Sequence, residues 1–236
     1  MTIWLKLAAG LAALAALAAL PEDAFAADAA HPVVVELFQS QGCSSCPPAL
    51  ANVMAVSGRP DVVALVFAVD YWDRLGWKDT FSKPEWTARQ ESYARSLKSD
   101  GVYTPEVVVN GRAEGTGLDA SGLEDLIRRG DRGAAGPQLG FSGGAVTVGP
   151  GAAPAGGAEV WLARYDPRVI EVAVKRGENA GRTLKHRNVV REMVLLGRWE
   201  GGAASYPIPA GGDPVLAEAA IVQTAGAGPV IAAAKR

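Results

Sequence analysis

The stretch VVVELFQSQGCSSCPPAL, from Val33 to Leu50, joins a strand-like segment to two cysteines and the start of a helix. Its first six residues are mostly apolar and β-branched, a pattern typical of a strand buried on both faces. Prolines follow Cys46, and a first helical turn tolerates proline because its N–H groups have no intrahelical partners. We therefore expect a strand that ends just before the cysteine pair and a helix that begins at it.

Cys43 and Cys46 have the spacing of a C-x-x-C pair. Two thiols three residues apart on a first helical turn face the same side and can close a small disulfide ring. The positive end of the helix lies closer to the first sulfur and favours its thiolate form. We therefore predict that Cys43 is partly exposed, with a lowered pKa, and that Cys46 is buried. In a redox couple, Cys43 would form a mixed disulfide with a client and Cys46 would resolve it.

Two other interpretations of the pair remain open. In one, the disulfide only staples a turn in a non-catalytic binding module. In the other, the cysteines hold zinc or copper, as in a metallochaperone. A closed zinc site needs four ligands, and the remaining nitrogen donors, His31 and His186, are distant in the sequence. The pattern therefore favours a redox dithiol with no resident metal.

Composition excludes several other classes of protein. The chain has 236 residues, enough for one large domain or two modest ones. Its 23 basic and 25 acidic residues give no electrostatic footprint for nucleic acid. Two cysteines cannot form a disulfide scaffold. No glycine-rich phosphate loop follows a strand, so we expect no organic cofactor.

The first 26 residues have the pattern of a signal peptide. Lys6 precedes the uncharged apolar run Leu7 to Leu20, which as a helix would span only about 21 Å, short for a membrane crossing. Ala24-Phe25-Ala26 supplies small residues for cleavage after Ala26. An uncleaved anchor is the alternative. We expect a periplasmic or secreted protein with no stable membrane span after cleavage, in a compartment where disulfides persist.

Residues 32–132 alternate strand-like and helix-like segments. The pattern predicts strands at Val33–Phe38, Val62–Val69 and Glu106–Val109, and helices at Pro47–Val56, Glu85–Lys98 and Leu118–Arg129. This alternation is typical of an α/β layer with a mixed or parallel sheet.

Residues 133–236 differ in character. A glycine- and proline-rich connection, 133–157, precedes spaced strand-length runs separated by turn residues. These runs predict a small all-β module, a sandwich or partial barrel, that packs against the α/β block. Asn188, Arg187 and Arg191 in this half are interpreted as solvated or strand-edge residues.

The order of elements around the cysteines resembles the thioredoxin fold. Longer strings, VVELFQSQGCSSCPPA (34–49), VDYWDRLGWKDTFS (69–82), RQ (89–90), YTPEVVVNG (103–111) and GENAGRTLKHRNVV (177–190), resemble the DUF1223 family of bacterial secreted, thioredoxin-like proteins of unknown function. The resemblance runs from about Pro32 to the C-terminus. It implies a thioredoxin-like domain with a redox site, but no established substrate.

The resemblance also implies roles for residues near the pair. Thr104-Pro105 is expected to have a cis peptide bond and to hold a client backbone beside the dithiol. Glu36 corresponds to a buried carboxylate that accepts the proton of the second cysteine, the alternative being a structural, hydrogen-bonded glutamate. The partners expected are a thiol or disulfide client protein and a redox partner protein.

The segment after the second strand is the other candidate region. Tyr71, Trp72 and Asp73 follow that strand, where its carboxyl end would open beside the cysteines. They would form a substrate-facing wall or pack the loop. The family typically has histidine before the Val-Asp-Tyr-Trp-Asp string, whereas this chain has Ala68, so a mechanism using that imidazole does not apply. Trp77, Phe81 and Trp86 are interpreted as core or loop anchors.

Overall fold

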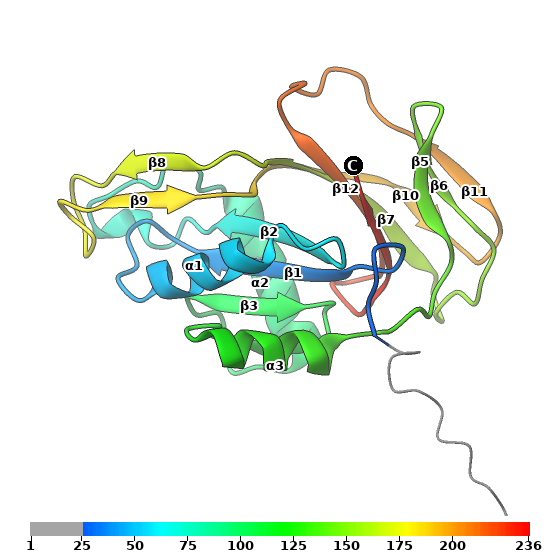
Figure 1. The fold of residues 1–236 in the computed structure, drawn as a ribbon, viewed down its shortest axis with the longest axis horizontal. Helices are drawn as coiled ribbons and strands as arrows, with labels where there is room; N and C mark the ends of the chain where they lie inside the picture. Colours follow the sequence, from blue (N-terminus) through cyan, green and yellow to red (C-terminus); the bar gives the residue numbers. More distant parts are fainter. Residues whose placement is uncertain (1–25) are drawn as a thin grey trace, which may run out of the picture.

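A computed structural model of the chain describes residues 26–236. Its largest element is a mixed eight-stranded sheet with the order β13-β12-β7-β10-β2-β1-β3-β4 (Figure 1). The predicted signal peptide falls almost wholly on residues 1–25, outside the described residues. In the described part, no helix has both the length and the apolar character needed to cross a membrane.

The N-terminal half contains the helices and strands that the sequence predicts, within a few residues at each end. β1 and β2 run parallel, and β3 runs antiparallel to β1. In chain order the elements are β1 (Val33–Gln39), α1 (Cys46–Val56), β2 (Val62–Ala68), α2 (Pro84–Leu97), β3 (Glu106–Val109), β4 (Ala113–Gly115) and α3 (Ala120–Gly130). A short 3-10 turn, Asp73–Leu75, lies between β2 and α2.

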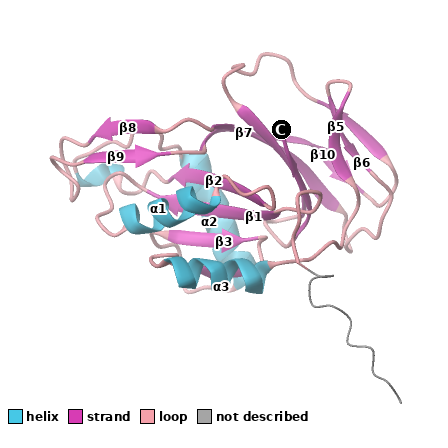
Figure 2. Ribbon diagram, viewed as in Figure 1, coloured by secondary structure: helices cyan, strands magenta, loops and turns pink. Residues whose placement is uncertain are grey.

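Every residue of β1 and β2 is buried, because helices or strands cover both faces of the sheet here. α1 and α3 pack on one face, where Val33, Val35 and Leu37 contact Leu50 and Leu123 in one apolar cluster. α2 lies on the opposite face (Figure 2). This arrangement brings the carboxyl ends of β1 and β2 to the same edge of the sheet, next to the start of α1.

The C-terminal half does not form a separate sheet module, which corrects the prediction from the sequence. Its longer strands continue the sheet of the N-terminal half from β2 outward. These are β7 (Ala158–Asp166), β10 (Val189–Trp199), β12 (Ala217–Thr224) and β13 (Val230–Lys235). The physical reason is that β2 would otherwise be an edge strand with unpaired backbone groups. β10 pairs with this edge and so joins the C-terminal strands to the same sheet.

The remaining strands form two smaller sheets. β5 (Leu139–Ser142), β6 (Ala145–Val148) and β11 (Ala204–Pro207) make a three-stranded sheet. Val146 and Val148 of this sheet pack on Val160, Leu162 and other residues of the large sheet, so this end is sandwich-like. β8 (Ile170–Ala173) and β9 (Thr183–His186) form a two-stranded hairpin that projects toward the opposite end of the molecule, beside α1 (Figure 1).

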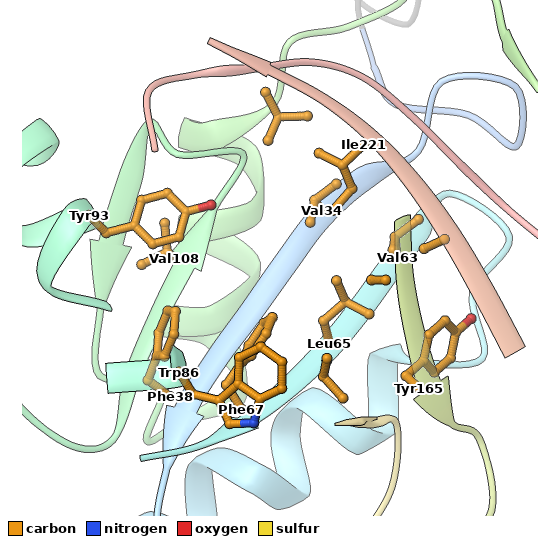
Figure 3. Packing of buried hydrophobic residues seen from close by; sticks show 14 of the residues in the cluster. Val34, Phe38, Val63, Leu65, Phe67, Trp86, Tyr93, Val108, Tyr165 and Ile221 are labelled. Carbon is orange, nitrogen blue, oxygen red and sulfur yellow. The ribbon is translucent and has the colours of Figure 1, made fainter. Parts of the chain in front are cut away.

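The large sheet curls, so its C-terminal strands also cover the face of β1 and β2 that α2 covers. Figure 3 shows Ile221 of β12 beside Val34 of β1, and Tyr165 of β7 near Leu65 of β2. Phe67 stacks on Phe38 at 5.2 Å between ring centres and meets Trp86 edge to face. Trp86 is therefore a core residue, as predicted.

Asn188 joins the two halves of the sheet. Its carbonyl oxygen accepts the N–H of Val66 at 2.9 Å, and its side-chain amide donates to the carbonyl of Ala64 at 2.9 Å. Its φ of 55° lies in the left-handed region, which asparagine tolerates better than most residues. Asn188 is buried, so its interpretation as a solvated or strand-edge residue is wrong.

Replacing Asn188 tests this junction. Asn188→Ala removes the hydrogen bond to Ala64 and places a Cβ-bearing residue with no local hydrogen bond at positive φ, so we expect a loss of about 2–3 kcal/mol in unfolding free energy. Asn188→Gly removes only the hydrogen bond and should lose about 1 kcal/mol. Urea unfolding measures the unfolding free energy of both variants and of the wild type. Equal stabilities for the alanine and glycine variants would contradict a strained junction.

Candidate functional site

Cys43 and Cys46 form a disulfide at the start of α1, with their Cα atoms 5.5 Å apart. Cys46 is the first residue of the helix, and Cys43 lies in the turn that follows β1. Ser44 and Ser45 between them are exposed. The strand, the cysteine pair and the helix thus follow each other as the sequence predicts.

Both cysteines are buried, with exposed fractions of 0% for Cys43 and 1% for Cys46. The prediction that Cys46 is buried is confirmed, and the prediction that Cys43 is partly exposed is wrong. The reason is tertiary: two segments distant in the sequence close over the turn that holds Cys43. One is the tip of the β8–β9 hairpin, and the other is the loop after β2.

The hairpin tip, residues 174–182, is fastened to the cysteine turn by hydrogen bonds. Asn179 is fully buried, and its side-chain amide donates to the carbonyl oxygens of Gln41 at 2.9 Å and Cys43 at 2.8 Å. The carboxylate of Glu178 accepts the backbone N–H of Ser44 at 2.9 Å. The tip therefore contacts the turn on both sides of Cys43.

Gly177 allows this close approach. Its φ of 79° favours glycine, and a Cβ built on it would lie 3.4 Å from Cβ of Trp77 and 3.8 Å from Cα of Gly42. Gly42 in turn packs beside Trp72. Hairpin tip, cysteine turn and post-β2 loop are thus in mutual contact.

The loop after β2 is tied to the residue before Gly42. The side chain of Gln41 accepts the indole N–H of Trp77 at 2.9 Å and donates to the hydroxyl of Thr80 at 2.9 Å. Its backbone N–H donates to the buried carboxylate of Asp79 at 2.7 Å. Trp77 is therefore a loop anchor, as predicted.

Asp79 is a buried acid at this junction. Its second oxygen accepts the N–H of Phe81 at 2.8 Å. Burial, with a further contribution from the charge of Asp73, raises the pKa of Asp79 to about 6. Asp73 itself accepts the backbone N–H of Asp79 at 3.1 Å and the hydroxyl of Ser82 at 2.8 Å. Of its two predicted roles, these contacts favour loop packing for Asp73.

The Thr104–Pro105 peptide bond is cis, as the resemblance implied. The hydroxyl of Ser45 reaches the carbonyl oxygen of Thr104 at 3.5 Å, so this segment lies beside the cysteine turn. The Thr104 hydroxyl accepts the indole N–H of Trp72 at 2.8 Å. Thr104 and Trp72 are therefore brought together with the disulfide, and both are partly exposed.

A second buried acid follows Pro105. Glu106 accepts a hydrogen bond from the side-chain amide of Gln90, whose other donor bond goes to the carbonyl of Tyr103 at 2.7 Å. Burial and the charge of Glu114 raise the pKa of Glu106 to about 7. Tyr71 donates its hydroxyl to Gln90 at 3.3 Å, and burial raises the pKa of Tyr71 to about 12. Tyr71 thus joins the site through Gln90.

Glu36 is buried but engaged away from the cysteines. Arg89 binds both oxygens of its carboxylate, at 2.6 and 2.8 Å, and the hydroxyl of Tyr93 donates to it at 2.6 Å. These partners lie on α2, on the face of the sheet opposite α1. The contacts favour the structural interpretation of Glu36 over that of proton acceptor for Cys46.

The histidines lie apart from the cysteines and from each other. His186 of β9 meets Phe81 edge to face at 5.4 Å, and burial lowers its pKa to about 4, with the charge of Arg191 adding to the effect. His31 contacts Asp28 at 3.0 Å. Within residues 26–236, no group of three or more metal-ligating side chains is placed to hold an ion.

No sequence pattern predicts a role for Glu178, Asn179, Asp79 or Gln41. Glu178 and Asn179 stand in the string GENAG, which carries the family resemblance, so the string itself was the available signal. Gln41 and Asp79 also lie inside such strings. Gln41 is 38 residues from Asp79 and 138 residues from Asn179 in the chain, so no local pattern pairs them.

The buried Asp79 predicts a pH dependence of stability. Its folded-state pKa is raised, so its protonated form stabilises the fold below the unfolded-state pKa, and this contribution is lost as pH rises through about 6. Relative to Asp79→Asn, wild-type unfolding free energy should fall by about 2–3 kcal/mol between about pH 4 and pH 7. Chemical unfolding across this range measures the difference. If the difference in unfolding free energy between wild type and Asp79→Asn does not change with pH, the raised pKa of Asp79 is contradicted.

The Glu36–Arg89 pair gives a second prediction. Glu36→Gln leaves the Arg89 guanidinium uncompensated in the core and should cost about 3–5 kcal/mol of unfolding free energy. The control Glu36→Gln/Arg89→Met removes both charges and should recover part of that loss. A stable Glu36→Gln protein whose disulfide exchange is slowed would instead support the proton-acceptor role.

Comparison with known proteins gives the chain a family. A family model described as protein of unknown function (DUF1223) matches residues 34–223. A crystal structure of a protein from Agrobacterium tumefaciens is 32% identical, covers 86% of this chain and 92% of its own, and has a TM-score of 0.70.

A structure of HBP35 of Porphyromonas gingivalis is 13% identical, with a TM-score of 0.55 over 87% of this chain and 74% of that one, and shows a likeness of fold. No curated protein matches the sequence. Because the family model spans most of the chain, this protein belongs to the DUF1223 family.

Proposed function

We propose that this protein is an exported thiol–disulfide oxidoreductase of thioredoxin-like fold, with Cys43 as the exchanging cysteine and Cys46 as the resolving one. One observation carries the proposal. The Cys43–Cys46 disulfide closes the turn between β1 and α1, beside the cis Thr104–Pro105 segment. A C-x-x-C pair at a helix start is the setting in which thiolate formation is favoured.

The strand order β2-β1-β3-β4 supports the thioredoxin-like assignment. α1 and α3 cover one face of these strands and α2 the other, with β3 antiparallel to β1. In this view, β10 and the strands beyond it are an extension added at the edge of β2.

The chemistry is a two-electron exchange. A client thiolate attacks Sγ of Cys43, the Cys43–Cys46 bond breaks, and Cys46 leaves as a thiolate that takes a proton. A second client thiolate then attacks the client sulfur of the mixed disulfide and releases the Cys43 thiolate. The client is oxidised to a disulfide and the protein is reduced to a dithiol. The same steps in reverse reduce a client disulfide.

The client would approach along the partly exposed surface of Ser45, Thr104 and Trp72. These residues border the cysteine turn and keep part of their surface exposed. The Thr104–Pro105 backbone would hold an extended client segment there. Export to the periplasm or beyond, predicted from residues 1–26, fits a disulfide chemistry because thiols are kept reduced in the cytosol.

Burial of both cysteines favours a second candidate, a binding module whose disulfide is structural. In that case the aromatic side chains of Tyr71 and Trp72 would contact a ligand, and the disulfide would only fix the turn. The two candidates differ in whether Cys43 exchanges disulfides.

Trapping separates the two functions. Cys46→Ala leaves Cys43 free to form a mixed disulfide that has no resolving thiol, so incubation with oxidised glutathione should give one stable adduct on Cys43. Cys43→Ala is the matched control, and its Cys46, the resolving cysteine of the proposal, should react slower than Cys43 by about tenfold or more, at the rate of an unactivated thiol. Mass spectrometry of the adducts measures both. Equally slow reaction of the two variants would support the structural disulfide.

A further inference from the structure

We propose that the tip of the β8–β9 hairpin is a built-in plug of the dithiol site, in which Asn179 fastens the cysteine turn and Glu178 disfavours the Cys43 thiolate. This inference rests on the proposed oxidoreductase function. The plug holds the site in its disulfide form until the tip lifts, either by local opening or on contact with a client.

The side chain of Asn179 fastens the hairpin tip to the cysteine turn. Asn179 is fully buried, and its amide donates both of its hydrogen bonds to backbone carbonyls of the cysteine turn, Gln41 and Cys43. Its side-chain oxygen accepts from the guanidinium of Arg182 at 2.7 Å, so all polar groups of the side chain have partners. With this side chain in place Cys43 is fully buried. The tip thus holds the backbone on both sides of Cys43, and in the proposal its displacement opens the sulfur to a nucleophile.

Glu178 places a negative charge at the start of α1. The Glu178 carboxylate accepts a hydrogen bond from the backbone N–H of Ser44, the residue after Cys43, at the positive end of α1. This hydrogen bond holds the pKa of Glu178 below its usual range. A thiolate at Cys43 would be a second negative charge at the same end of the helix. Like charges at one site disfavour ionisation, so Glu178 raises the free energy of the reduced, ionised form.

The β8–β9 hairpin is attached to the rest of the molecule mainly by side-chain contacts at its base and its tip. β8 and β9 pair only with each other among the described strands, and they do not join either larger sheet. At its base the hairpin is anchored by the buried His186, which packs against the half-buried Phe81 of the loop after β2. At its tip it is held by the Glu178 and Asn179 hydrogen bonds and by the packing of Gly177 beside Trp77. An isolated two-stranded hairpin is marginally stable, so the tip can lift while the base stays packed.

The redox step follows from these contacts. Two glutathione molecules reduce the disulfide: the first forms a mixed disulfide at Cys43 and displaces Cys46 as a thiolate, and the second releases Cys43 as oxidised glutathione forms. The Cys43 thiolate that appears then repels the Glu178 carboxylate. Reduction and lifting of the tip are therefore coupled.

The experiment compares Glu178→Gln with Glu171→Gln in the full-length protein. Both variants remove one negative charge from the hairpin, but Glu171 is exposed on β8 and contacts Lys185 at 3.6 Å instead of the cysteine turn. Each protein is equilibrated with glutathione buffers, and the dithiol fraction is measured after acid quenching and alkylation. The rate of Cys43 alkylation against pH gives its thiol pKa.

Glu178→Gln should shift the equilibrium toward the dithiol by about two- to fivefold and lower the pKa of Cys43, because it removes a charge at the helix end. The shift should shrink at about 1 M salt, which screens exposed charges. Glu171→Gln should leave both readouts at wild-type values. Asn179→Ala should speed reduction by dithiothreitol about fivefold or more, as expected for two lost hydrogen bonds.

The outcomes separate the plug from the proposed function. If wild-type protein equilibrates with glutathione but Glu178→Gln matches Glu171→Gln, the plug is refuted and the oxidoreductase stands. If no variant exchanges with glutathione at all, the proposed function fails, and the plug fails with it. If Asn179→Ala does not fold, the comparison of Glu178→Gln with Glu171→Gln still tests the plug. Glu178 is exposed, so its replacement leaves the core intact.

Discussion

The pairing of β10 with β2 is the constraint on which the rest of the structure depends. It makes one sheet of two halves of the chain, through the backbone of Asn188 and the register Val189 with Val66. Because β7 and β10 are antiparallel neighbours, with Asp166 opposite Val189, the segment between them must leave and return at the same edge. That edge is where β1 ends and the disulfide lies, so the strand pairing places the two ends of the segment that carries the β8–β9 hairpin near the cysteine turn.

Contacts over this edge explain how the C-x-x-C pair comes to be buried. The cysteine turn alone would leave Cys43 open at the start of α1. The hairpin tip brings Asn179 and Glu178 to it from one side, and the loop after β2 brings Asp79 and Trp77 through Gln41. Asn179 and Asp79 are buried with their polar side-chain atoms paired, which fixes one geometry for the closed turn. In the proposed function, reactivity is then controlled by displacement of the tip.

The local parts of this arrangement were predictable from the sequence, because they depend on neighbouring residues. The apolar strand, the cysteine spacing and the prolines at the helix start lie within Val33 to Leu50. The cis Thr104–Pro105 bond came from the family resemblance. The burial of Cys43 was not predictable, since Asn179 is 136 residues away from it. The same holds for Glu36, whose partner Arg89 has no pattern linking it to the strand, and for Asn188, which is polar yet sits at a sheet junction.

Hydrogen exchange of the hairpin tip, followed by mass spectrometry across a glutathione titration, tests the central claim most directly. We expect slow exchange of the amides in residues 174–182 while the Cys43–Cys46 disulfide is intact. The same amides should exchange faster as the dithiol fraction rises, with β7 and β10 unchanged. A dithiol that forms without any change in exchange at the tip would contradict coupling between the tip and the disulfide.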